Sequence, residues 1–228
     1  MHNRQHLLVL VLFPALLLAH LLPAQVSDAQ FWENVNVEHK LTRDLTARFS
    51  HEGRFTDNDS RLTYFFEDAG LEYKFPKTHF GILADYVYIR KHVLDDWSNR
   101  HQYYTALTYA QKFGAFQLHD RQMLMGQVKD VYSSETGKLP EWYLRNKLTV
   151  KYNFNFYWSV YAAEEAYWHV NAVMSQELHF NRMRYFVGGF YRPNKHNEFE
   201  LYYLVEQHMH VSNANHNYVL GVGYTLSI

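Results

Sequence analysis

The chain has 228 residues, with 22 Lys and Arg against 23 Asp and Glu, and this balance of charge gives no sign of a nucleic-acid partner. It contains no cysteine, which excludes a disulfide framework, a thiolate metal site and a cysteine nucleophile. Aromatic residues make up 18% of the chain although its mean hydropathy is negative, so the rings are interleaved with polar residues rather than gathered in apolar blocks.

The amino-terminal segment has the organisation of a secretory signal peptide. A short basic region precedes the apolar run Leu7–Leu22, and small residues follow up to Ala29. This order predicts a signal peptide over residues 1–29 with cleavage after Ala29, and Ala24 is the second candidate site. Residues 30–228 then form the mature chain, and export without cysteine is typical of a bacterial envelope protein.

Past residue 30, apolar and polar residues alternate with period two. The clearest case is Trp142–Phe154, where apolar residues occupy every second position apart from Asn146 and polar or charged residues occupy most of the others. Successive side chains of a β-strand point to opposite faces, so this pattern predicts a strand with one apolar and one polar side.

The same alternation predicts eleven strands joined by hairpins. Their expected ranges are 31–41, 45–55, 62–75, 79–91, 100–113, 115–128, 142–154, 156–168, 182–192, 197–208 and 216–228. Tight turns are expected at 42–44, 76–78, 114, 155 and 193–196, and longer polar loops at 56–61, 92–99, 129–140, 169–181 and 209–215. Short turns at one end and long loops at the other describe a single antiparallel up-and-down barrel.

Alternation alone does not say which face is the interior, since soluble barrels are apolar inside and membrane barrels are apolar outside. The predicted strands are long enough for the roughly 9–11 residues that a tilted membrane-spanning strand needs. Aromatic pairs gather near strand ends, as in the girdles of membrane barrels: Phe31/Trp32, Trp142/Tyr143, Tyr157/Trp158 and Tyr167/Trp168. We therefore predict an all-β fold, a transmembrane β-barrel with short periplasmic turns and longer outer loops.

The predicted number of strands is about 10–12. Eleven segments are visible in the sequence, whereas bacterial single-chain barrels normally have an even number, which places both termini at one end. Either residues 31–41 do not span, which leaves ten strands, or residues 169–181 contain a further strand, which makes twelve.

Several short motifs run through the chain. They are Trp32, Glu52-x-Arg54, Gly70-Leu71-x-Tyr73, Ala84-Asp85-Tyr86, Glu164-Glu165, Arg184-x-x-x-Gly188-x-x-Tyr191 and His216-x-x-Val219-Leu220-Gly221-x-x-Tyr224. On these motifs the chain from Phe31 to Ile228 resembles the uncharacterised envelope family called domain of unknown function 2490, predicted outer-membrane β-barrels of Gram-negative bacteria. The resemblance implies a fold and a place in the cell outer membrane, and it implies no activity.

The polar faces carry a ladder of charged residues that we expect to face the lumen. Its members are Arg48, Glu52, Arg54, Arg145, Lys147, Lys151, Arg182, Arg184, Arg192, Glu198, Glu200 and Glu206. Pairing about a turn near Asn194–Lys195 brings Arg184 close to Glu206 and Arg192 close to Glu198. Two interpretations stay open: ion pairs that fill a narrow lumen, and a selectivity lining for small solutes.

The stretch from His208 to Ser212 suggests two kinds of chemistry. His208 and His210 share a strand face but lack a third ligand, so no metal site is predicted. The motif His210-x-Ser212-Asn213 resembles the His-x-Ser-Asn stretch of lipid A deacylase barrels, and the resemblance implies that His210 would activate Ser212 for acyl hydrolysis. A catalytic His also needs an acid, but residues 213–228 contain neither Asp nor Glu.

The sequence thus predicts a non-enzymatic outer-membrane barrel, either structural or a narrow passage for small solutes with a charged lumen. One alternative is an outer-membrane acyl hydrolase that uses His210 and Ser212; another is a soluble periplasmic barrel that binds a lipophilic ligand. No cofactor is expected. The expected partners are outer-membrane lipid, lipopolysaccharide and the outer-membrane insertion machinery, and the sequence does not fix the oligomeric state.

Overall fold

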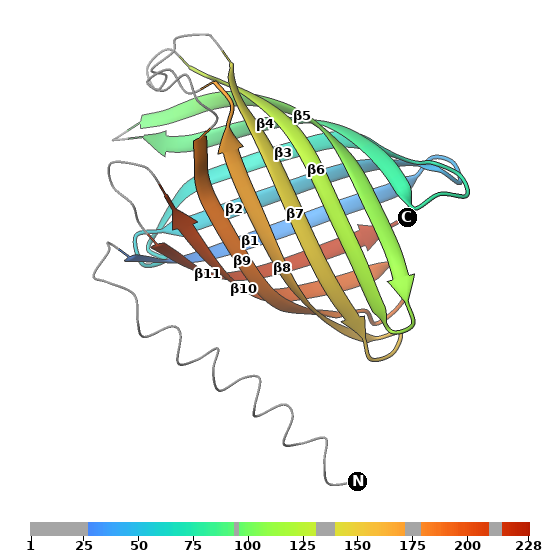
Figure 1. The fold of residues 1–228 in the computed structure, drawn as a ribbon. Helices are drawn as coiled ribbons and strands as arrows, with labels where there is room; N and C mark the ends of the chain where they lie inside the picture. Colours follow the sequence, from blue (N-terminus) through green and yellow to red (C-terminus); the bar gives the residue numbers. More distant parts are fainter. Residues whose placement is uncertain (1–26, 94–95, 131–139, 172–178, 210–215) are drawn as a thin grey trace, which may run out of the picture.

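The alternating segments of the sequence form the strands of one closed sheet. A computed structural model describes residues 27–93, 96–130, 140–171, 179–209 and 216–228. The strands are β1 (Ser27–Lys40), β2 (Leu45–Thr56), β3 (Arg61–Lys74), β4 (Phe80–Val93), β5 (Asp96–Phe113), β6 (Phe116–Lys129), β7 (Glu141–Asn153), β8 (Trp158–His169), β9 (His179–Tyr191), β10 (Asn197–His208) and β11 (His216–Ser227). Each strand pairs with the next one in sequence, and the meander closes into a barrel (Figure 1). The predicted all-β, up-and-down fold is confirmed.

The barrel closes through a parallel pair. Strand β1 pairs with β11 in parallel from Ser27 opposite His216 to Glu38 opposite Ser227, whereas every other pair is antiparallel. Neighbouring strands of a meander alternate in direction, so the first and last of eleven strands run the same way. Both routes to an even number are therefore wrong: β1 is a full member of the sheet, and β8 pairs directly with β9.

The two ends of the barrel differ in their connections. We call the end at which β1 joins β2, β3 joins β4, and so on to β9 and β10, the turn end. We call the opposite end, at which β2 joins β3, β4 joins β5, and so on to β10 and β11, the loop end. Because the strand count is odd, β1 begins at the loop end and the chain finishes at the turn end (Figure 1). The two described chain ends thus lie at opposite ends of the barrel.

Two of the five predicted long loops are in fact short. Strands β2 and β3 are separated only by residues 57–60, where Asp57, Asn58 and Asp59 have φ values of 55°, 56° and 63°. Asp and Asn tolerate this left-handed region better than other non-glycine residues, so polar sequence here marks a compact turn.

The second difference concerns the predicted loop 92–99, most of which is strand. Strand β4 continues to Val93 and β5 starts at Asp96, with His92 directly opposite Trp97. The two rings pack edge to face at 5.4 Å between centroids. Aromatic packing of this kind stabilises a hairpin even where its residues are polar.

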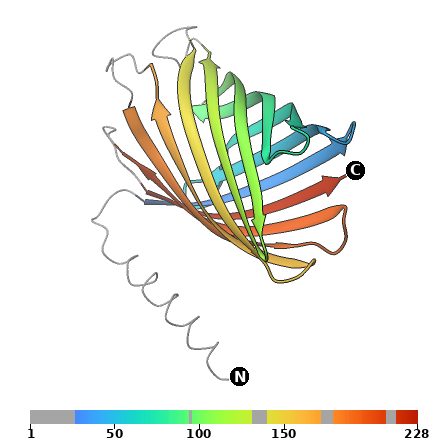
Figure 2. The same ribbon diagram turned by 45° about the vertical axis from the view of Figure 1, so that its right-hand side comes forward.

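The outer wall of the barrel is largely apolar. The strands surround the lumen on all sides (Figure 2). Each strand carries at least one exposed apolar side chain, and these include Val35, Phe49, Leu71, Ile82, Leu107, Leu124, Val150, Val160, Val187, Leu201 and Leu220. The inner wall holds two buried apolar clusters. One is formed by Leu83, Val87, Ile89, Tyr104, Ala106, Met123 and Met125; the other by Trp32, Tyr161, Ala163, Tyr202, Leu204 and Val219.

The aromatic pairs predicted as girdles divide between the two walls. Trp32, Tyr143 and Tyr167 line the lumen, while their sequence neighbours lie on the other face. Of the four predicted pairs, only Tyr157 and Trp158 are both exposed, because Tyr157 precedes the first residue of β8. The prediction was wrong for the other pairs because adjacent residues of one strand cannot share a face.

Within the described residues, no helix is long and apolar enough to cross a membrane.

Candidate functional site

The lumen contains a cavity of about 770 Å³ with a strongly charged lining. Ten cationic side chains and five carboxylates line it: Arg48, Arg54, Lys91, Arg100, Arg121, Lys129, Arg145, Lys147, Arg182 and Arg184, with Glu52, Asp68, Glu165, Glu200 and Glu206. Two more buried carboxylates pair with lining cations, Asp85 at 3.7 Å from Arg48 and Glu141 at 2.6 Å from Lys129. Even with these two, positive charges around the cavity exceed negative ones by three.

Nine residues of the predicted ladder line this cavity: Arg48, Glu52, Arg54, Arg145, Lys147, Arg182, Arg184, Glu200 and Glu206. The other three lie near the turn end. The ammonium group of Lys151 lies 4.1 Å from the ring centroid of Phe190, and Arg192 forms an ion pair with Glu198. The predicted pairing of Arg192 with Glu198 is therefore confirmed.

Glu165 on β8 is the most heavily compensated carboxylate of the lumen. It is only 2% exposed, and it forms ion pairs with Arg145 at 2.8 Å, Arg121 at 3.1 Å and Arg184 at 3.4 Å. The hydroxyl of Tyr167 donates a further hydrogen bond to it at 2.9 Å. A buried carboxylate stays charged only with such partners, so this cluster ties β6, β7, β8 and β9 together across the lumen.

Arg184 joins Glu165 to a second buried carboxylate, Glu206 on β10. The Nε of Arg184 donates to Glu206 at 2.6 Å, as the predicted hairpin register requires. Glu206 also accepts a hydrogen bond from Asn217 at 2.9 Å and contacts His208 at 3.0 Å. The two carboxylates and their partners form one continuous polar network.

A third group packs a cation against aromatic rings. The guanidinium of Arg54 lies 3.8 Å from the ring centroid of Trp32 and 4.6 Å from that of Tyr64, and its Nε donates to Glu52 at 2.5 Å. Stacking and ion pairing together hold this side chain in one orientation.

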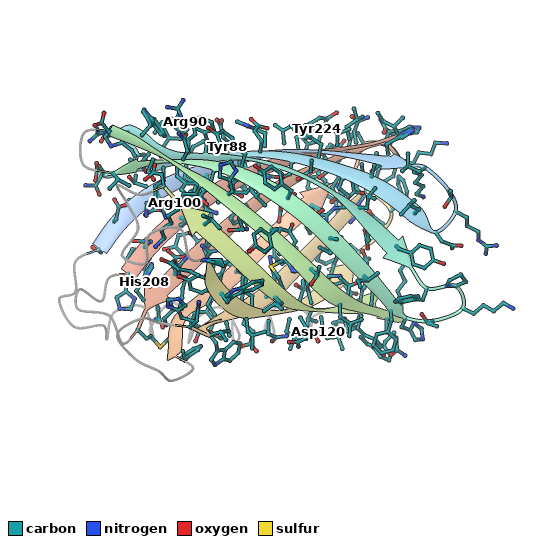
Figure 3. The ribbon with its side chains drawn as sticks, turned by 90° about the horizontal axis from the view of Figure 1, so that it is seen from above. Tyr88, Arg90, Arg100, Asp120, His208 and Tyr224 are labelled. Carbon is teal, nitrogen blue, oxygen red and sulfur yellow. The ribbon has the colours of Figure 1, made fainter. Side chains whose placement is uncertain are left out.

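Four further cations lie toward the loop end. We call Lys91, Arg100, Lys129 and Arg182 the mouth cluster; each lines the cavity, and they come from β4, β5, β6 and β9. Figure 3 places Arg100 and His208 toward this end of the barrel. Only Arg182 belongs to the ladder predicted from the sequence. Lys91 and Arg100 were missed because they lie at the ends of the two predicted strands that flank the expected loop 92–99, and Lys129 because it falls in the expected loop 129–140. In addition, the inner faces of β4 to β6 are largely apolar.

The candidate hydrolase residues His210 and Ser212 lie outside the described residues, and so does the second imidazole of the His208/His210 pair. Glu206, which has the same parity as His210 and Ser212 in the alternating pattern, forms an ion pair with Arg184. In the part of the chain that the structure describes, no group of three or more His, Cys, Asp or Glu side chains could hold a metal ion.

Fold and site together define a closed eleven-stranded barrel with an apolar outer wall and a charged, partly filled lumen. The chain belongs to the family described as Protein of unknown function (DUF2490), whose model matches residues 29–218. The resemblance drawn from its short motifs is thereby confirmed.

Two solved structures are similar at low identity. LpxR from Salmonella typhimurium is 10% identical, with 83% of this chain and 84% of that chain covered and a TM-score of 0.48. An anion-selective porin from Comamonas acidovorans is 8% identical, with 79% of this chain and 55% of that chain covered and a TM-score of 0.37. These values are too low to carry either protein's role to this chain. No curated protein matches the sequence.

Proposed function

We propose that this protein is an outer-membrane β-barrel that offers small solutes a narrow, charged lumen. The observation that carries the proposal is the distribution of polarity, since apolar side chains such as Val187 and Leu201, each 58% exposed, face outward while charged residues face the cavity. In water this arrangement would leave a large apolar surface exposed, whereas hydrocarbon solvates it.

The dimensions of the strands support the same proposal. The strands contain from 12 to 18 residues, more than the roughly 9–11 that a tilted strand needs to cross a bilayer. Hydrogen bonding around the closed sheet leaves no unpaired strand edge, which a lipid environment requires. The signal peptide predicted over residues 1–29 supplies the route of export.

The lumen is suited to small solutes because side chains occupy much of it. The two apolar clusters and the network around Glu165 and Glu206 project inward and leave the cavity of about 770 Å³ between them. A lipophilic ligand would need a mainly apolar cavity, whereas ten cationic side chains and five carboxylates line this one beside the apolar clusters. We therefore do not retain the soluble, lipophilic-ligand alternative.

Lipid partners are proposed at the outer rim of the loop end. Arg61 contacts His92 at 2.7 Å, and the guanidinium of Arg90 lies 5.3 Å from the ring centroid of Trp97. Arg90, His92 and Trp97 share the face of the β4–β5 hairpin opposite to that of the cavity-lining Lys91. Cations beside aromatic rings suit the headgroup level of a membrane, so we assign this rim to the phosphate groups of lipopolysaccharide. Insertion would use the outer-membrane insertion machinery, as for other barrels of this kind.

The test begins with fractionation of cells that express the full chain, followed by gel mobility of the outer-membrane extract with and without boiling. Migration that changes on heating, in that fraction, is the expected result, and conductance in planar bilayers then tests passage. Recovery of the folded protein in the soluble periplasm would overturn the membrane assignment. A heat-modifiable barrel that never conducts would leave the structural role and overturn passage.

A further inference from the structure

The mouth cluster brings like charges together on neighbouring strands. Arg100 lies directly opposite Lys129 in the register of β5 and β6. Lys91 lies opposite Ser98, two residues from Arg100, so Lys91 and Arg100 are diagonal neighbours on the same inner face. Like charges that face each other across strands destabilise a sheet unless something compensates them.

The carboxylates around the mouth compensate only part of this charge. Glu141 pairs with Lys129 at 2.6 Å, and Glu206 lies 3.5 Å from Arg182 while also serving Arg184 at 2.6 Å. Asp130 lies nearby and accepts a hydrogen bond from the backbone N–H of Asn99. No ion pair of Lys91 or Arg100 with a carboxylate is found within the described ranges.

Two hydrogen-bond donors of the mouth cluster also lack a partner in the part of the chain that the structure describes. The Nε atoms of Arg100 and Arg182 are buried and have no hydrogen-bond partner among the described residues. An unpartnered guanidinium nitrogen inside a protein is unfavourable, and a bound oxygen acceptor would relieve it. Lys91, Arg100, Lys129 and Arg182 all line the same cavity, near the ends of their strands at the loop end.

We propose that the mouth cluster binds a small soluble oxyanion, a carboxylate or a phosphate, in the loop-end half of the lumen. Arg100 and Arg182 supply planar donors suited to two oxygens of one anion, and Lys91 and Lys129 supply point charges. Because the four side chains line the cavity and not the outer wall, the ligand is a solute rather than a lipid headgroup. The inference deepens the proposed function by naming the class of solute. It rests on the proposed function only for the step in which the bound anion passes through the lumen.

Equilibrium binding tests the site without any need for conductance. The full chain, folded in a zwitterionic detergent, is titrated with inorganic phosphate in an isothermal calorimeter, alongside the double variant Lys91→Gln/Arg100→Gln. The matched control is Lys77→Gln/Lys195→Gln, which also removes two positive charges but from exposed turns at the opposite end. We expect the mouth variant to bind phosphate roughly tenfold or more weakly, because hydrogen bonds to charged groups are the strong ones, and the control to bind like the wild type.

Equal affinity in the two double variants, or no phosphate binding by the wild type, would overturn the site. A shared loss in both would indicate a general charge effect and would also overturn it. To check that the mouth variant folds, its heat-modifiable gel migration is compared with that of the wild type; if it does not fold, Lys91→Gln alone takes its place.

Bilayer measurements then separate this proposal from the one on which it rests. The reversal potential is measured under a gradient of potassium chloride. Both passage and the oxyanion site are supported if the wild type conducts and favours chloride, and if only the mouth variant shifts toward cations. Phosphate binding without any conductance refutes passage and leaves the oxyanion site in place. Conductance that favours cations in the wild type would overturn the passage of anions through the lumen.

Discussion

Glu164 and Glu165 are neighbours in sequence and occupy opposite environments. Glu165 is 2% exposed and contacts three arginines in the lumen, while the side chain of Glu164 is exposed on the outer wall of the same strand. The pair gives a test of the polar network in which one residue is the matched control of the other.

Substitution of Glu165 by Gln should destabilise the barrel strongly. It leaves Arg121, Arg145 and Arg184 without their shared counter-charge, and removal of one member of a buried ion pair typically costs about 3–5 kcal/mol. The free energy of unfolding, measured in urea by tryptophan fluorescence, should fall by this order, and Glu164→Gln should leave it nearly unchanged. Similar losses in the two variants would refute a special role for the inner carboxylate.

Gly188 and Gly189 offer a second matched comparison. A Cβ at Gly188 would lie 2.8 Å from the backbone oxygen of Leu201 and 2.8 Å from side-chain atoms of Tyr161 and Tyr202, whereas at Gly189 the nearest atom is 3.3 Å away. Gly188→Ala should therefore cost about 1–3 kcal/mol through overpacking, and Gly189→Ala should cost less. The temperature at which each variant loses its folded gel mobility measures the difference; the reverse order would contradict the packing described for the lumen.

Tryptophan fluorescence can distinguish the two walls. Trp158 is 54% exposed on the outer wall and Trp32 is 4% exposed in the lumen. In variants that retain only Trp32 or only Trp158 of the five tryptophans in the chain, brominated lipid should quench the fluorescence of Trp158 much more than that of Trp32. Quenching of Trp32 alone would mean that the apolar and polar faces have been assigned the wrong way round.

The mature amino terminus is a further prediction. The sequence favours cleavage after Ala29, but Ser27, Asp28 and Ala29 pair with β11, and Asp28 accepts a hydrogen bond from the backbone N–H of Asn58 at 2.9 Å. Because these contacts need residues 27–29, we expect the protein purified from outer membranes to begin at Gln25, after the second candidate site. Its intact mass distinguishes the two; a chain that begins at Gln30 would instead have a shortened β1.

Much of the fold follows from alternation, because a period of two both identifies a strand and divides its two faces. In the hairpin of β9 and β10 the pattern predicts even a single contact, because the turn near Asn194 fixes the register and hence brings Arg184 to Glu206. The parallel closure could not be predicted in the same way, because it depends on the number of strands and not on any local pattern.

The site was predicted only where the inner face is clearly polar. On β6, Arg121 shares its face with Met123 and Met125, so alternation there gave no charged face to assign to the lumen. Trp32, Tyr143 and Tyr167 were misassigned for a related reason, since an aromatic ring suits a lipid-facing wall and a cation-lined lumen equally well.

The parallel seam between β1 and β11 also determines how the protein can be labelled. A peptide tag inserted between the expected cleavage site and Ser27 and one fused after Ile228 emerge from opposite ends of the barrel. If the barrel spans the outer membrane, antibody or protease added to intact cells reaches only one of them. Two tagged proteins, compared in whole cells and in lysed cells, are therefore enough to determine the sidedness of the whole fold.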